Sequence, residues 1–229
     1  MPTDKPTIPR QLWLRRDVLG LITCGLGLAA LARAWPALAQ HKKGPAEVSV
    51  DELMKPGPLP ELSLGSADAP ITVVEYASMT CGHCAHFHNT VFPLLKEKYI
   101  DTGKVHFIMR EFPLDNLAVA ASMLARCAGG EKTFPLISAL FAKQEEWAFV
   151  HGDPRPELLK LAKQAGFTKE SFDKCLTDQK LLEKIEAVRA RAAKVFGVKA
   201  TPTFFINGKK LDGVTLEDFE KAFAPILKN

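Results

Sequence analysis

The sequence predicts an α/β fold in which an all-helical segment interrupts a single sheet. A strand–helix–strand pattern spans residues 71–109, and the two strands of such a unit run parallel because the helix carries the chain back along the sheet. Residues 115–196 lack a convincing strand pattern and show helical periodicity broken by glycine and proline. Strand patterns resume at 203–212. We therefore expect two separated parts of the chain to share one sheet, with the helical segment inserted between them.

The first 39 residues differ from the rest of the chain. Basic residues precede an apolar run at 19–32, and Ala37-Leu38-Ala39 is a small-x-small cleavage site. This order is typical of a secretory signal peptide, so we expect cleavage after Ala39. The alternative is a membrane anchor, but the run of 14 residues is shorter than the ~20 that a membrane span needs. Arg15-Arg16 resembles a twin-arginine signal, which leaves the general secretory and twin-arginine routes both open.

Charge and cysteine content narrow the function. Loss of residues 1–39 removes five of 30 basic and two of 26 acidic side chains, which leaves a net charge of +1. This balance does not favour nucleic acid as a partner. Cys24 leaves with the signal peptide, and four cysteines remain: Cys81, Cys84, Cys127 and Cys175. An even number in an exported protein predicts two disulfides.

The rest of the chain divides into four parts. Residues 40–61 contain four prolines, which favour extended chain over helix, so we expect an N-terminal tether there. The sheet domain should occupy 62–114, the helical insertion 115–196, and the second part of the sheet domain 197–229.

The first part of the sheet domain should begin with a short edge strand at 62–65. Residues 71–77 are apolar on both faces except for Glu75, which predicts a central strand. The helix over 85–100 should kink at Pro93, which has no N–H to donate. The other expected elements are a strand at 104–109, helices at 116–128, 133–145, 155–165, 169–176 and 180–196, strands at 203–206 and 209–212 joined by an Asn207-Gly208 turn, and a last helix at 216–227 capped by Thr215.

A Cys-x-x-Cys motif, Cys81-Gly-His-Cys84, stands between the 71–77 strand and the helix that follows. A helix N-terminus favours negative charge, so it favours the thiolate of Cys81, the expected nucleophile. His83 can add positive charge or a hydrogen bond to that thiolate. Cys84, one turn further in, is the expected resolving partner. Together they predict a redox-active disulfide.

The alternatives for this pair are a structural disulfide and a zinc site. Zinc would draw on His86 or His88, which follow closely. The chain has no second CxxC or HxxxH motif to complete a closed site, so we interpret both histidines as polar surface residues. We expect neither a metal nor an organic cofactor.

The order of the elements and three motifs resemble the DsbA family of exported thiol:disulfide oxidoreductases, whose thioredoxin fold carries an inserted helical domain. The resemblance covers about residues 62–228. The motifs are Glu75-Tyr-Ala-Ser-Met-Thr-Cys-Gly-His-Cys84, Arg110-Glu-Phe-Pro-Leu114 and Ala200-Thr-Pro-Thr-Phe-Phe-Ile-Asn-Gly208.

The resemblance implies a substrate-binding loop at Thr201-Pro202. It implies that the bond before Pro202 is cis, that the loop packs beside the cysteines, and that the backbone of Thr201 pairs with the bound polypeptide. The best-known oxidants of the family have Pro-His between the cysteines and Val before the cis-proline. This chain has Gly82-His83 and Thr201 there, so the direction of electron flow stays open.

Glu75 lies six residues before Cys81 in the expected central strand. A buried carboxylate is costly to ionise, and family members carry an acid at this place. We expect Glu75 to exchange a proton with Cys84 during the reaction. The alternative is a carboxylate at the strand end, in water.

Cys127 and Cys175 lie in different expected helices, 48 residues apart. We interpret them as a structural disulfide that ties the insertion together. Two buried free thiols and a second redox pair are the alternatives.

These features predict a periplasmic, monomeric oxidoreductase that passes its Cys81–Cys84 disulfide to exported polypeptides with free thiols. The resemblance implies reoxidation by a quinone-linked membrane partner of the DsbB type. One alternative is a reductase or isomerase kept reduced by a membrane electron donor. Such isomerases usually have a separate dimerisation domain, for which residues 40–61 are too short. The other alternative is a binding protein that kept the fold without the activity.

Overall fold

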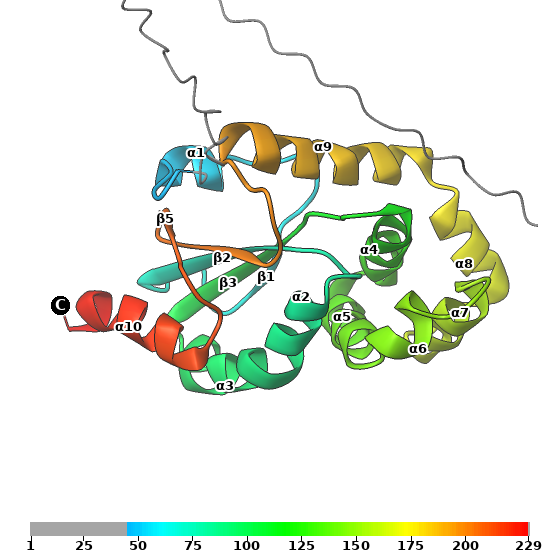
Figure 1. The fold of residues 1–229 in the computed structure, drawn as a ribbon, viewed down its shortest axis with the longest axis horizontal. Coiled ribbons are helices and arrows are strands. Elements are labelled where there is room, and N and C mark those ends of the chain that lie inside the picture. Colours follow the sequence, from blue (N-terminus) through cyan, green and yellow to red (C-terminus); the bar gives the residue numbers. More distant parts are fainter. Residues whose placement is uncertain (1–44, 229) are drawn as a thin grey trace, which may run out of the picture. The chain divides into compact units, whose positions relative to one another are not determined.

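A computed structural model describes residues 45–228 (Figure 1). The expected signal peptide and the first residues of the expected tether lie outside this range. Within the described range, no helix combines the length and the apolar character needed to cross a membrane.

One mixed sheet organises the described chain. Within residues 45–228 it has five strands in the order β1-β3-β2-β4-β5. The strand β2 is parallel to β3 and antiparallel to β4, which places it at the centre. The bounds are β1 Leu62–Leu64, β2 Ile71–Ala77, β3 Val105–Glu111, β4 Thr203–Ile206 and β5 Lys209–Lys210. Since β2 and β4 come from opposite sides of the helical segment, the expected two-part sheet is confirmed.

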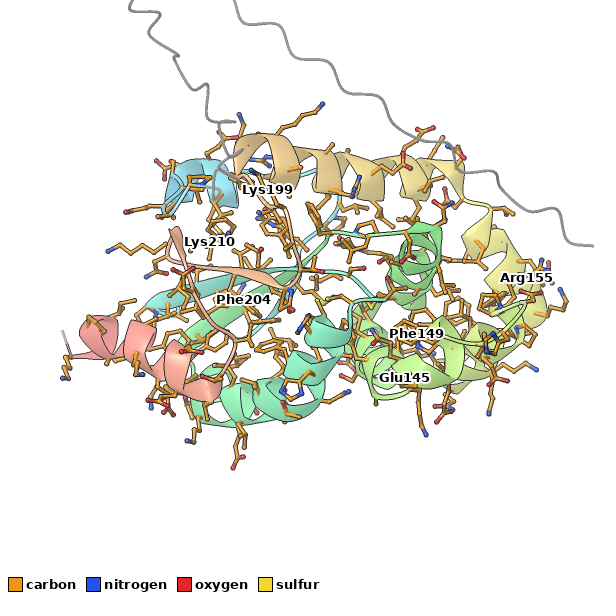
Figure 2. The ribbon with its side chains drawn as sticks, viewed as in Figure 1. Glu145, Phe149, Arg155, Lys199, Phe204 and Lys210 are labelled. Carbon is orange, nitrogen blue, oxygen red and sulfur yellow. A yellow bond between two sulfur atoms is a disulfide. The ribbon has the colours of Figure 1, made fainter. Side chains whose placement is uncertain are left out.

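The two faces of the sheet carry separate cores, because successive side chains of a strand point to opposite faces. Val73 of β2 and Phe204 of β4 belong to the larger core, where Phe204 packs against helix α10, Leu216–Leu227 (Figures 1 and 2). Val74 and Phe205 belong to the smaller core on the opposite face, under helix α9.

The helical segment after β2 is continuous from 82 to 100 but changes its winding. It consists of α2 Gly82–His86, a π-helical turn η1 Phe87–Val91, α3 Phe92–Leu95 and a second π-helical turn η2 Lys96–Ile100. In the first π turn the N–H of Phe92 bonds the carbonyl of Phe87. The irregularity expected around Pro93 thus takes the form of a π turn, since Pro93 cannot donate to the preceding turn.

The expected insertion is helical, and its last helix also covers one face of the sheet. Its elements are α4 Asn116–Ala128, the 3-10 turn η3 Gly130–Lys132, α5 Thr133–Ala142, α6 Gln144–Ala148, α7 Arg155–Gln164, α8 Lys169–Leu176 and α9 Gln179–Val195. The single helix expected over 133–145 is two helices, which meet at Lys143. Ala192 of α9 is fully buried in the smaller core, so this last helix returns to cover the sheet.

The expectation of an extended tether over 40–61 is wrong for the described residues. Helix α1, Val50–Met54, forms there with Ser49 as its N-cap, and Leu53 is buried in the smaller core. The buried Arg110 donates to the carbonyl of Leu53, which ties α1 to the sheet. The prolines flank this helix instead of interrupting it, and its apolar face packs on the sheet, which a local composition argument cannot foresee.

A disulfide joins Cys127 of α4 to Cys175 of α8, with the two Cα atoms 6.2 Å apart. It links two helices of the insertion that also pack against each other. Cys127 is exposed and Cys175 is buried.

Replacing both Cys127 and Cys175 by serine is expected to lower the free energy of unfolding by about 4 kcal/mol, because the bond closes a loop across 48 residues in the unfolded chain. Denaturant unfolding would measure this, with the Cys81–Cys84 pair kept oxidised in both proteins. Equal midpoints for the variant and the parent would show that the bond does not constrain the unfolded chain.

Candidate active site

Cys81 stands at the N-cap position of α2, one short loop after β2. Its side chain makes no capping hydrogen bond, and the carbonyl of Cys81 accepts the bond from the N–H of Ala85. The sulfur therefore sits at the positive end of the helical segment 82–100, where a thiolate is stabilised.

Four hydrogen bonds fix the loop that carries Cys81. The hydroxyl of Thr80 donates to Asp115, the N-cap residue of α4, over 2.6 Å. The hydroxyl of Ser78 accepts from the N–H of Leu114. Gln144 of α6, itself buried, donates to the carbonyls of Met79 and Cys81 over 2.7 and 3.1 Å. The helical insertion thus holds the nucleophile in place.

Sequence reasoning missed Gln144. It is 63 residues from Cys81, and its local sequence does not distinguish it from any polar residue at the start of a short helix. Its role comes from the packing of α6 against the active-site loop, so nothing in its local sequence indicates it.

The two active-site cysteines are thiols of very different acidity. The pKa of Cys81 is lowered from 9.0 to about 5, chiefly because the Cys84 thiol donates to its sulfur, with further help from Thr201 and from backbone N–H groups. Burial raises the pKa of Cys84, and its donation to Cys81 and the charge of Glu75 raise it further. Cys81 is 8% exposed and Cys84 is fully buried. Near neutral pH the structure therefore holds a nearly buried thiolate at Cys81 beside the fully buried thiol of Cys84.

His83 is exposed and lies between the two cysteines. From the sequence alone, its imidazole is expected to support the thiolate. In the structure, the contribution of His83 to the lowered pKa of Cys81 comes from its backbone N–H.

The loop before β4 forms the opposite wall of the site. The peptide bond between Thr201 and Pro202 is cis. In its protonated form, the thiol of Cys81 donates to the carbonyl of Thr201 over 3.2 Å. The hydroxyl of Thr201 is buried and has no hydrogen-bond partner among the described residues, but it lies close enough to Cys81 to lower the pKa of that thiol. Thr201 therefore presents two polar atoms to the reactive sulfur.

Glu75 of β2 is fully buried, which excludes the alternative of a carboxylate in water. Its Oε2 lies 2.8 Å from Nε2 of His88. Its other oxygen, Oε1, has no hydrogen-bond partner among the described residues.

The interpretation of His88 as a surface residue is wrong, whereas His86 is exposed as expected. His88 is four residues after Cys84, so both lie on the same face of the helical segment, and that face packs on the sheet. The spacing of four from a buried cysteine was the available signal.

Metal-binding potential is low in the part of the chain that the structure describes: no three or more His, Cys, Asp or Glu side chains are grouped there so as to hold an ion. A cavity of about 1150 Å³ lies along the β1 edge, lined among others by Leu62, Phe134 and Leu181. Its lining does not include Cys81 or Cys84, so the chemistry described above does not take place in it.

Comparison with known proteins agrees with this geometry. The family model described as Thioredoxin matches residues 59–224. The structure of alpha-DsbA1 from Wolbachia pipientis is 35% identical, with a TM-score of 0.71, over 79% of this chain and 96% of that one. The chain belongs to the DsbA-like branch of the thioredoxin family. The resemblance found in the sequence and the predicted fold class are therefore confirmed.

Two further proteins resemble this DsbA-like chain, one in sequence and one in fold. A protein from Rickettsia bellii, provisionally named a protein-disulfide oxidoreductase, is 38% identical over 162 residues. The match covers 71% of this chain and 62% of the relative, so the chain spans less than two thirds of that protein. BdbD from Bacillus subtilis shares the fold, with 22% identity and a TM-score of 0.66.

Proposed function

We propose that this chain is an exported thiol:disulfide oxidoreductase that introduces disulfide bonds into other exported proteins. The observation that carries the proposal is the acidity of Cys81, whose pKa is lowered to about 5 beside the buried thiol of Cys84. A stabilised thiolate makes the reduced enzyme more stable, which makes its disulfide a stronger oxidant.

The reaction transfers two electrons from the substrate to the enzyme. A substrate thiolate attacks Sγ of Cys81 in the Cys81–Cys84 disulfide, and Sγ of Cys84 leaves as a thiolate that takes up a proton. A mixed disulfide now joins the substrate to Cys81. The second substrate thiolate attacks the substrate sulfur of that bond, which forms the substrate disulfide and releases Cys81 as a thiolate. The low pKa of Cys81 makes it a good leaving group in this step.

The wall formed by Thr201 and Pro202 supports binding of an extended polypeptide. The carbonyl of Thr201 lies 3.2 Å from the sulfur of Cys81, so a substrate strand paired there would place its own cysteine at the reactive atom. The substrates are exported polypeptides with free thiols, and the pair is reoxidised by a quinone-linked membrane protein of the DsbB type. The mature enzyme acts in the periplasm as a monomer, after loss of its signal peptide.

A disulfide reductase or isomerase is the second candidate. The observation that favours it is the Thr201 hydroxyl beside Cys81, together with Gly82-His83 between the cysteines, since both differ from the pattern of the best-known oxidants.

Equilibration of the mature protein with glutathione buffers separates the two candidates. A reduction potential of about −120 mV, the value of DsbA, is expected for an oxidant, whereas one of about −270 mV, the value of thioredoxin, is expected for a reductase. A Cys127→Ser/Cys175→Ser variant is the control that assigns the signal to Cys81 and Cys84. Absence of any exchange would favour a binding protein that has kept the fold.

A further inference from the structure

His88 and Glu75 form a buried polar pair directly behind the redox cysteines. His88 and Cys84 share one face of the helical segment 82–100, and that face packs on β2, where Glu75 lies. The 2.8 Å contact between Nε2 of His88 and Oε2 of Glu75 requires a hydrogen between them, because both atoms can otherwise only accept.

The imidazole of His88 is held in a fixed orientation. Its ring stacks on Phe141 of α5 with the centroids 4.4 Å apart and an interplanar angle of 14°. The rings of Phe87 and Phe92 close two further sides, at 5.2 and 5.0 Å. This packing prevents the ring from swinging into water and keeps Nε2 on Glu75.

The residues paired with Glu75 on the two neighbouring strands have no side chain that could donate or accept a proton. Its partners are Met109 on β3 and Phe204 on β4, both apolar. His88 is therefore the group that can share a proton with Oε2, while Oε1 is left without a partner among the described residues.

Other titratable groups around the pair are accounted for. From the active site these are Cys81 and Cys84. From β3, Glu111 lies one step along the same face, and both of its oxygens accept from Arg126 of α4, which neutralises it. Helix α5, residues 133–142, contributes Phe141 and contains no titratable side chain.

We propose that His88 is a positioning residue for Glu75, so that the two act as one proton-holding pair for Cys84. The inference rests on the proposed function and deepens it. During substrate oxidation, Cys84 leaves as a thiolate and receives a proton from the pair, which becomes a carboxylate bonded by a neutral imidazole. During reoxidation, Cys81 is first held in a mixed disulfide with the oxidant. Cys84 then returns its proton to the pair, attacks Sγ of Cys81, and the oxidant leaves as a thiolate.

The geometry explains why a pair is needed rather than a single acid. Cys84 and Glu75 are both fully buried, and each would become a negative charge in a medium of low dielectric at some point in the cycle. The charge of Glu75 already acts on Cys84, since it raises the pKa of that thiol. An imidazole that takes up a proton offsets the negative charge at the moment when Cys84 ionises.

The test follows the reduced enzyme as it reacts with glutathione disulfide, with acid quenching and mass measurement. Attack by Cys81 forms a mixed disulfide, and attack by Cys84 resolves it. In His88→Gln, which keeps a hydrogen bond but does not titrate, we expect resolution to slow by about tenfold to a hundredfold and its pH profile to flatten. Attack by Cys81 should keep its rate within about twofold, because substitutions that share no partner with a site usually change its energetics by no more than about 0.5 kcal/mol.

Matched variants separate this role from a structural one. His86→Gln alters an exposed histidine of the same helix and should resolve the mixed disulfide at the parent rate. His88→Phe keeps the aromatic stacking and should also slow resolution. If His88→Gln unfolds, His88→Phe carries the test, because it also lacks the titratable ring and keeps the stacking on Phe141. When His88→Gln and Glu75→Gln both fold, the double variant should resolve the mixed disulfide no more slowly than the slower of the two single variants.

The outcomes distinguish failure of the proposed function from failure of the role of His88. A parent protein that forms no mixed disulfide at all would overturn the proposed function. A parent that exchanges normally, with His88→Gln and His88→Phe resolving at its rate and pH profile, would overturn the role of His88 alone. A loss of thermal stability with an unchanged ratio of attack to resolution would show that His88 only packs the core.

Discussion

Replacing Cys84 by serine is expected to trap substrates on the enzyme, whereas replacing Cys81 by serine is expected to remove exchange. In Cys84→Ser the Cys81 thiolate still attacks disulfides, but the buried thiol that would release the product is absent. Stable mixed disulfides at Cys81 should accumulate and be visible as higher-mass species under non-reducing conditions.

The Cys81→Ser protein should behave in the opposite way. Its remaining active-site thiol, Cys84, has a pKa raised above the ordinary value, so less than about 3% of it is thiolate at neutral pH. The Cys81 thiol, with a pKa of about 5, is almost fully ionised there. Reaction with a small disulfide should therefore slow by at least about 30-fold from ionisation alone, and burial of Cys84 adds to this loss.

The control is the Cys127→Ser/Cys175→Ser variant, which should exchange disulfides at the parent rate. That result would confine the redox chemistry to Cys81 and Cys84, although Cys127 is exposed. Equal trapping by Cys81→Ser and Cys84→Ser would contradict the assigned roles, and so would exchange that depends on Cys127.

The sheet and the cysteine helix were predictable because local patterns decide them. β2 is apolar on both faces, which is the pattern of a central strand, and the structure places it between β3 and β4. Asn207 adopts a positive φ of 46° at the turn between β4 and β5, as the Asn-Gly signal predicts. The assembly of a two-part sheet follows from the same patterns.

The contacts that complete the site depend on tertiary packing and could not be predicted in this way. Gln144 reaches the active-site loop from a helix 63 residues later, and Leu53 becomes core only because the sheet offers a face for α1. His88 could be predicted in part. Its burial could have been inferred from its spacing to Cys84, but its pairing with Glu75 needed the relative placement of helix and strand.

The reduced protein is expected to gain stability as the pH rises from about 5 to about 9, when it is compared with Cys81→Ser. The pKa of Cys81 is about 5 in the folded protein and 9.0 ordinarily, so the unfolded chain binds a proton at this thiol over a range where the folded protein does not. The stabilisation is therefore fully present above 9 and is lost as the pH falls through 5. Its full size is about 5 kcal/mol, of which about 3 kcal/mol is present at pH 7.

Cys84 sets the upper limit of this gain. Its pKa is raised in the folded protein, so it adds stability at low pH that is lost as the pH rises above its ordinary value of 9.0. The stability of the reduced form should thus pass through a maximum near pH 9. The disulfide form has neither thiol and should lack this dependence.

Denaturant unfolding at several pH values measures the effect. All proteins should carry the Cys127→Ser/Cys175→Ser changes, so that reductant acts only on the active site. Because the Cys84 thiol is the largest cause of the low pKa of Cys81, Cys84→Ala should raise that pKa and shrink the gain, while Cys84→Ser, which keeps a donor, should retain more of it. A reduced form whose stability does not rise between pH 5 and 9 would contradict a stabilised Cys81 thiolate, and with it the reason for expecting an oxidant.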